Sequence, residues 1–234
     1  MGYGVLVSAV IIGAAIAFFL QNNSKFSKQL LMFSAGLLLS ITILDMFPSL
    51  YSGGGIHAGI WVIIGVGIQL ILEGISKGIE HGHVHHHKHG TGTIVPLSVL
   101  LGLFIHSFLE GTPIEAQHTH HHHAGHEHSN ILWALSIHKV SESIVLATFL
   151  FSLHIKKIYS FLILALFAIS APVGVYFGSF LNSEFYPKIL GIVSGIFLHI
   201  SSVIIFESNE KHALNWQKLL FVFGGMLCGY LITQ

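Results

Sequence analysis

Charged side chains are scarce in this chain of 234 residues: they make up 9% of it, and arginine is absent. A soluble domain normally carries about 25% charged residues, whereas here 53% of the residues are hydrophobic. The composition therefore excludes an ordinary soluble protein and indicates an integral membrane protein. Ten lysines balance ten acidic residues, so the chain has no basic excess of the kind that binds nucleic acid.

Cysteine is almost absent too, since Cys228 is the single one. One cysteine excludes a disulfide framework and leaves the redox compartment undetermined. The abundant residue is histidine, with 19 in the chain.

Long apolar runs fill most of the chain. A helix crosses the hydrocarbon layer with about 20 apolar residues, and eight stretches meet this requirement. They fall near residues 3–20, 29–48, 56–76, 95–115, 130–152, 158–180, 186–206 and 215–232. The connections are short, and no soluble domain fits between them. We therefore expect an all-α fold in which residues 1–234 form a single bundle of eight transmembrane helices.

Lysines gather in the segments that follow the odd-numbered spans. These segments hold Lys25, Lys28, Lys77, Lys88, Lys156, Lys157, Lys211 and Lys218, whereas the segments on the other side hold only Lys188. Positively charged loops stay on the cytoplasmic side. We therefore expect both termini outside, in a multi-pass protein of the cell (plasma or inner) membrane.

Two connecting segments are rich in histidine. Residues 77–93 are expected on the cytoplasmic side, and residues 116–129, which include seven histidines, outside. Neutral imidazole is a common protein ligand for zinc, copper and nickel. Weak metal capture is the function that we favour for both segments, and an inert soluble linker is the alternative.

Two neighbouring spans each carry a histidine followed four residues later by a glutamate: His106 and Glu110 in the fourth span, and His138 and Glu142 in the fifth. On a helix this spacing places both side chains on one face. At 1.5 Å per residue, His106 lies about 18 Å from one membrane surface and His138 about 12 Å from the other. The two pairs thus overlap in depth. Ionisable residues at that depth are costly and indicate a function.

The two pairs offer two imidazole nitrogens and two carboxylates. This set suits Zn²⁺ and tolerates Fe²⁺, Mn²⁺, Co²⁺ or Cd²⁺. A lone buried histidine more often bonds to a backbone carbonyl, and a lone glutamate can be protonated or paired with Lys139. Two pairs with the same spacing in consecutive antiparallel spans favour a metal site over these alternatives.

Other polar residues also lie within spans. Asp45, near the outer end of the second span, is either an entrance ligand or a group facing interfacial water, and His199, in the middle of the seventh, is a candidate transient site. Glu73, in the inner half of the third span, is either part of the exit or a solvated charge. Pro113 removes a bond to the carbonyl of Leu109. That carbonyl either lines the route or marks an ordinary kink.

The fourth span, His106-Ser107-Phe108-Leu109-Glu110-Gly111, resembles the His-Ser/Asn-x-x-Glu-Gly signature of the ZIP (Zrt/Irt-like) metal transporters. His138-Lys139-x-x-Glu142 resembles the next span of that family, and looser matches extend the resemblance to most of the chain. The resemblance implies eight spans with both ends outside and uptake of divalent transition metal, usually Zn²⁺, into the cytoplasm. It also implies metal ligands at His106, Glu110, His138 and Glu142. The oligomeric state stays open, with a homodimer as one option.

The chain departs from the family pattern beside both histidines. Many members carry Asn after the first histidine and an acidic residue after the second, which help to bridge a second metal. Here these positions hold Ser107 and Lys139. Because a lysine ammonium repels a divalent cation, we expect one bound metal, with Ser107 as a pathway residue.

Two other functions fit part of the pattern. A metal exporter of the cation-diffusion type also has histidine-rich loops, but it has six spans and a cytoplasmic C-terminal domain. An intramembrane zinc hydrolase would need three protein ligands, an open water position and a general base, as in His-Glu-x-x-His. That string does not occur in the sequence. We therefore expect a transporter and no enzymatic activity.

Overall fold

The computed structural model describes residues 2–19, 24–55, 57–76, 97–116, 127–153, 155–182, 184–207 and 216–234. The regular elements in this part of the chain are all helices, and it contains no strand. The histidine-rich segment 77–93 lies outside the described residues, as do residues 117–126 of the second such segment.

The helices lie at the positions of the predicted spans. They are α1 (Gly2–Phe19), α2 (Ser24–Ile41), η1 (Thr42–Met46), α3 (Phe47–Gly54), α4 (Ala58–Ser76), α5 (Leu97–Ala116), α6 (Glu127–Ser152), α7 (Lys157–Gly178), α8 (Tyr186–Glu207) and α9 (Trp216–Ile232). The segments α2, η1 and α3 together form the second span, as one continuous helix, which we call the α2–α3 rod. Within the described residues, seven helices are long and apolar enough to cross a membrane, and α9 is a shorter apolar helix. The predicted all-α membrane bundle is confirmed.

The second span is longer than predicted, because the π-helical turn η1 joins α2 to α3 without a break. The amide of Phe47 donates a hydrogen bond to the carbonyl of Thr42, five residues earlier. Pro48 directly follows this turn, so the amide that a proline lacks falls where the regular i to i−4 bonding is already interrupted. The α2–α3 rod therefore continues to Gly54. Asp45 lies in the π-helical turn, a feature that is frequent at functional sites.

Close helix pairs form where glycines let two backbones approach. A methyl group placed on Gly65 of α4 would overlap the carbonyl oxygen of Ile192 in α8, and one placed on Gly195 of α8 would overlap that of Val62 in α4. The same kind of contact joins α2 to α9 (Gly36, Gly225), α5 to α7 (Gly111, Gly174) and α1 to α6 (Gly13). Small residues are the usual means of close helix packing in membranes.

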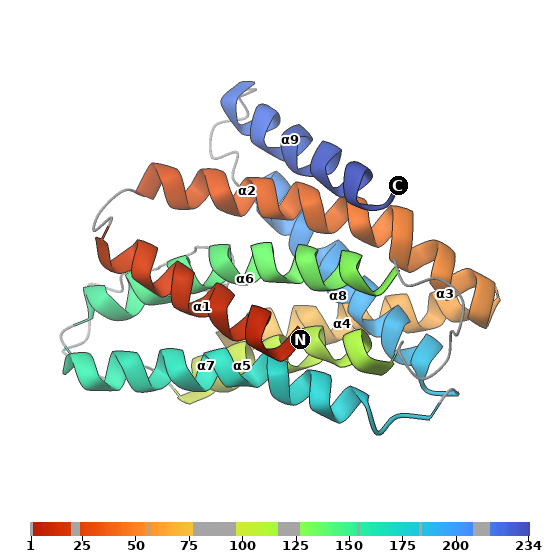
Figure 1. Ribbon diagram of the computed structural model, residues 1–234, viewed down its shortest axis with the longest axis horizontal. Helices are drawn as coiled ribbons and strands as arrows, with labels where there is room; N and C mark the ends of the chain where they lie inside the picture. The colour runs from red at the N-terminus through yellow and green to blue at the C-terminus, as the bar shows by residue number, and fades with distance from the viewer. Residues whose placement is uncertain are drawn as a thin grey trace.

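These four pairs form two sets of helices. Contacts between α1 and α7 connect α1, α5, α6 and α7, and contacts between α2 and α8 connect α2, α4, α8 and α9. The two sets meet mainly where α2 packs on α6 and α4 packs on α5. Figure 1 shows α9 against the outer side of α2, with α6 between α2 and the pair formed by α5 and α7.

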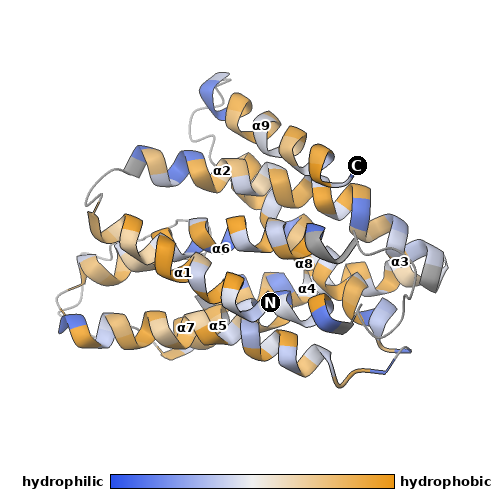
Figure 2. Ribbon diagram, in the orientation of Figure 1, coloured by the Kyte–Doolittle hydropathy of each residue, from blue (hydrophilic) through white to orange (hydrophobic). Residues whose placement is uncertain are grey.

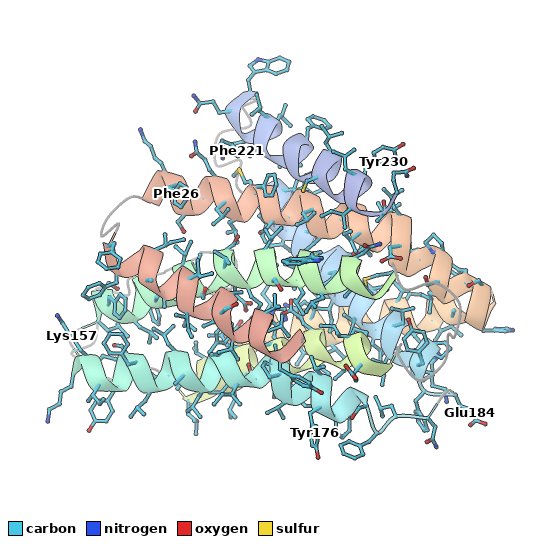
Figure 3. All side chains as sticks on the ribbon, in the orientation of Figure 1. Phe26, Lys157, Tyr176, Glu184, Phe221 and Tyr230 are labelled. Carbon is cyan, nitrogen blue, oxygen red and sulfur yellow. The ribbon has the colours of Figure 1, made fainter. Side chains whose placement is uncertain are left out.

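The outer faces of the bundle are apolar. Side chains such as Ile63, Leu166 and Leu231 are more than half exposed. Apolar residues cover most of each helix, and hydrophilic ones mark the starts of α2, α7 and α9 (Figure 2). Lys157 and Glu184 lie at opposite ends of the bundle (Figure 3). Apolar faces between polar ends are the pattern of a multi-pass membrane protein.

Candidate metal site

Two adjacent helices bring the four predicted ligand residues together. His106 and Glu110 come from the middle of α5, and His138 and Glu142 from the middle of α6. One ligand atom from each residue lies within 4.8 Å of the other three. All four residues are at most 1% exposed. The i to i+4 spacing thus places both pairs on facing helix surfaces, at the same level along the two helices.

Each imidazole faces a carboxylate from its own helix and one from the neighbouring helix. The Nε2 atom of His106 lies 3.2 Å from Oε1 of Glu110 and 3.7 Å from Oε1 of Glu142. The Nε2 atom of His138 lies 3.5 Å from Oε1 of Glu110 and 4.0 Å from Oε2 of Glu142. Tetrahedral ligands about 2.0–2.1 Å from zinc are about 3.3 Å from one another. The four side chains therefore need only small shifts to surround one such ion.

The atoms that face this common point are buried, and none of their contacts within the described part of the chain has the geometry of a good hydrogen bond. They are Nε2 of His106, Nε2 of His138, Oε1 of Glu110 and Oε1 of Glu142. Burying polar atoms without partners costs free energy, and each such case needs an explanation. A single divalent cation between the four atoms would satisfy all of them.

Gln69 of α4 orients His106 from the second set of helices. Its Oε1 atom lies 3.1 Å from Nδ1 of His106. When Nδ1 donates its proton to this oxygen, the lone pair of the neutral ring is on Nε2, which faces the glutamates. Gln69 was not among the predicted site residues. A glutamine inside an otherwise apolar span is the sequence signal that could have identified it.

Lys139 contacts both glutamates of the site. Its Nζ atom pairs with Oε2 of Glu110 and lies 2.6 Å from Oε2 of Glu142. The same nitrogen lies 5.0 Å from the centre of the Phe167 ring in α7. Lys139 is fully buried. The predicted proximity of an ammonium to the site is thus present, and this ammonium bonds the carboxylates themselves.

The remaining predicted residues lie outside the group of four. His199 of α8 pairs with Glu73 of α4 at 2.7 Å from Nε2 to Oε2. Their side chains are 14% and 24% exposed. Asp45 is half-buried in η1. Ser107 is buried beside His106, and its hydroxyl has no hydrogen-bond partner in the described ranges.

Pro113 has a local explanation. The hydroxyl of Thr112 donates a hydrogen bond of 2.7 Å to the carbonyl of Leu109, which is the group that a proline at position 113 leaves without its amide donor. Because this carbonyl already has a donor, the structure favours the ordinary kink over a carbonyl that lines the route.

Comparison with known families agrees with the geometry of the site. The family model described as "ZIP Zinc transporter" matches residues 73–233 of the sequence. This range covers more than half of the chain and includes all four converging residues, Gln69 being just outside it. A search of curated proteins finds no match.

Proposed function

This chain belongs to the ZIP zinc transporter family, and from that premise we propose that it imports Zn²⁺ into the cytoplasm through the site formed by His106, Glu110, His138 and Glu142. Membership makes the chain a divalent metal transporter and an integral membrane protein. The choice of zinc, the direction and the cell membrane as its location are the proposal. The observation that supports it best is the set of four buried nitrogen and oxygen atoms that converge on one point without a well-formed hydrogen bond.

The donor set favours zinc among the divalent cations. Imidazole nitrogens suit Zn²⁺ and its transition-metal neighbours, and carboxylates also accept harder ions such as Mn²⁺. Fe²⁺, Mn²⁺, Co²⁺ and Cd²⁺ are therefore the competing cargoes. Binding requires neutral imidazoles and ionised carboxylates, so protons compete with the metal. Uptake should consequently weaken as the pH falls.

Polar residues of α4 suggest the inner part of the route. Gln69 contacts the central site, and Glu73, four residues later, lies about 6 Å further along the helix. Glu73 is paired with His199. Beyond them, α4 ends at Ser76, directly before the histidine-rich segment 77–93. We assign His199 and Glu73 as a transient site on the way to the cytoplasm, and we keep Asp45, Ser107 and the segment 116–129 as candidates for the outer part.

Movement of the ion through a closed bundle requires a change of shape. The hydrogen bond between Gln69 and His106 crosses from one set of helices to the other, so a shift of one set against the other would open the site to one side at a time. Such alternating access is how transporters with a binding site near the midplane work.

The direct test of this function is zinc uptake by the purified protein in lipid vesicles that contain a zinc-sensitive dye. We expect a saturable rise of the dye signal that empty vesicles lack. Right-side-out membrane vesicles should accumulate zinc, whereas accumulation only in inverted vesicles would indicate the exporter alternative. A rate equal to that of empty vesicles would contradict transport.

Replacing His199 with alanine should slow uptake without changing binding at the central site. Loss of one transient ligand raises the barrier to exit, and about 1.4 kcal/mol of added barrier corresponds to a tenfold slower rate. We therefore expect about tenfold slower uptake at an unchanged equilibrium affinity, measured by dye competition in detergent. The exposed His57 provides the control, His57→Ala. An equal loss of affinity and uptake in His199→Ala would argue against a separate transient site.

A further inference from the structure

Lys139 lies directly beside the proposed ion site. It follows His138 in α6, it is fully buried, and its ammonium bonds both Glu110 and Glu142. A buried ammonium needs such compensation, because an unpaired charge inside a protein is very costly.

In each glutamate one oxygen contacts Lys139 and the other faces an imidazole, and the Oε2 atom of Glu142 also lies 4.0 Å from Nε2 of His138. The Oε2 atoms of Glu110 and Glu142 contact the ammonium of Lys139. Their Oε1 atoms face the imidazole of His106, and that of Glu110 also faces His138. An ionised carboxylate accepts bonds on both oxygens. The carboxylates can thus bridge the ammonium on one side and a metal ion on the other.

We propose that the Lys139 ammonium acts as a permanent positive charge in the site. It holds the two carboxylates in position before the metal ion binds, and it lowers their affinity for the ion once the ion is bound. The inference rests on the proposed function. It assigns Lys139 as a positioning residue that sets the affinity for the transported ion and limits the site to one metal ion.

The charges determine whether Lys139 raises or lowers the affinity of the site for the metal ion. Without an ion, two buried carboxylates would repel each other, and the ammonium removes most of that repulsion. With an ion present, the ammonium and the divalent cation share the same carboxylates and repel each other. Both effects lower the affinity for the ion, and both therefore make its release easier.

The Phe167 ring keeps the ammonium in this place. The ring centre lies 5.0 Å from Nζ of Lys139, within the distance at which an aromatic face attracts a cation. The residue comes from α7, so a third helix helps to hold the ammonium near the carboxylates.

The test compares zinc affinity and uptake kinetics of the full-length protein with those of Lys139→Met and Lys139→Gln. Both changes remove the charge, and the Gln side chain keeps a hydrogen-bond donor for a carboxylate, so it carries the test if the Met variant fails to fold. We expect Zn²⁺ to bind at least about tenfold more tightly, which is about 1.4 kcal/mol. Uptake should show a lower KM together with a lower kcat, because release becomes slower.

A lysine with a merely structural role would give a different result. Its loss would lower the amount of folded protein and weaken binding, whereas the proposed role requires tighter binding. The matched control is Lys188→Met. Like Lys139, Lys188 lies near aromatic rings, those of Trp61 and Phe185, but it is near the start of α8 and outside the group of four ligand residues. Unchanged or weaker zinc affinity in both Lys139 variants would overturn the inference. Zinc binding that survives in His138→Ala would instead overturn the proposed site itself.

Discussion

Replacing His138 with alanine is expected to abolish saturable zinc uptake. The change removes one of four donor atoms and leaves the bonds of Lys139 to Glu110 and Glu142 in place, so the fold should persist. Loss of a residue that merely orients a metal ligand costs about 10–100-fold in affinity or activity, and loss of a ligand itself should cost more than 100-fold. The measurement is the initial rate of zinc uptake into vesicles at equal protein content.

Glu110→Ala should give the same loss of uptake. This glutamate contributes the oxygen closest to both imidazole nitrogens, at 3.2 Å and 3.5 Å. Because the variant also leaves Lys139 with one carboxylate fewer, its folded fraction has to be measured alongside. His57→Ala, which changes an exposed histidine outside the group, should transport normally. Unaltered uptake in both His138→Ala and Glu110→Ala would reject the site.

Zinc should stabilise the purified protein strongly, and the effect should disappear in His106→Ala. An ion that binds only the folded state at 100 times its Kd adds about 2.7 kcal/mol. For a chain of this size that is a rise of about 5–10 °C in Tm. The measurement is thermal unfolding in detergent with and without zinc. It reports binding separately from movement of the helices.

Magnesium provides the ion control for this experiment. Mg²⁺ prefers octahedral oxygen ligands and gives up its water reluctantly, so a site with two imidazoles should not hold it. We expect no rise in Tm with Mg²⁺ in the wild type. An equal rise with zinc in the wild type and in His106→Ala would show that the stabilising ion binds elsewhere.

Most of the fold could be predicted because its main determinants are local. An apolar run of about 20 residues has to satisfy its backbone internally and therefore forms a helix in a membrane. The one clear difference lies in the second span, which was predicted to end at Pro48, whereas the helix continues to Gly54. Whether a proline ends a helix depends on the carbonyl that its missing amide would have reached, and the wide turn at Thr42–Met46 has no simple sequence signal.

The convergence of the four proposed ligand residues could be predicted for a related reason. His106 with Glu110, and His138 with Glu142, each belong to a single helix, so spacing alone places each pair on one face. The helices are consecutive spans, so their antiparallel arrangement and overlapping depth also follow from the sequence. The structure added the distances and showed that the four donor atoms face one another.

The sequence by itself determined the class of protein, the helices and the two pairs that carry the proposed site, because these depend on neighbours within one or two helices. The tertiary structure decided which groups surround that site. Gln69 and His106 are 37 residues apart, and Glu73 and His199 are 126 residues apart, so their pairing depends on how α4 packs against α5 and α8. The position of Lys139 between carboxylates of two different helices also depends on helix packing. These tertiary contacts define the electrostatic environment that an ion meets.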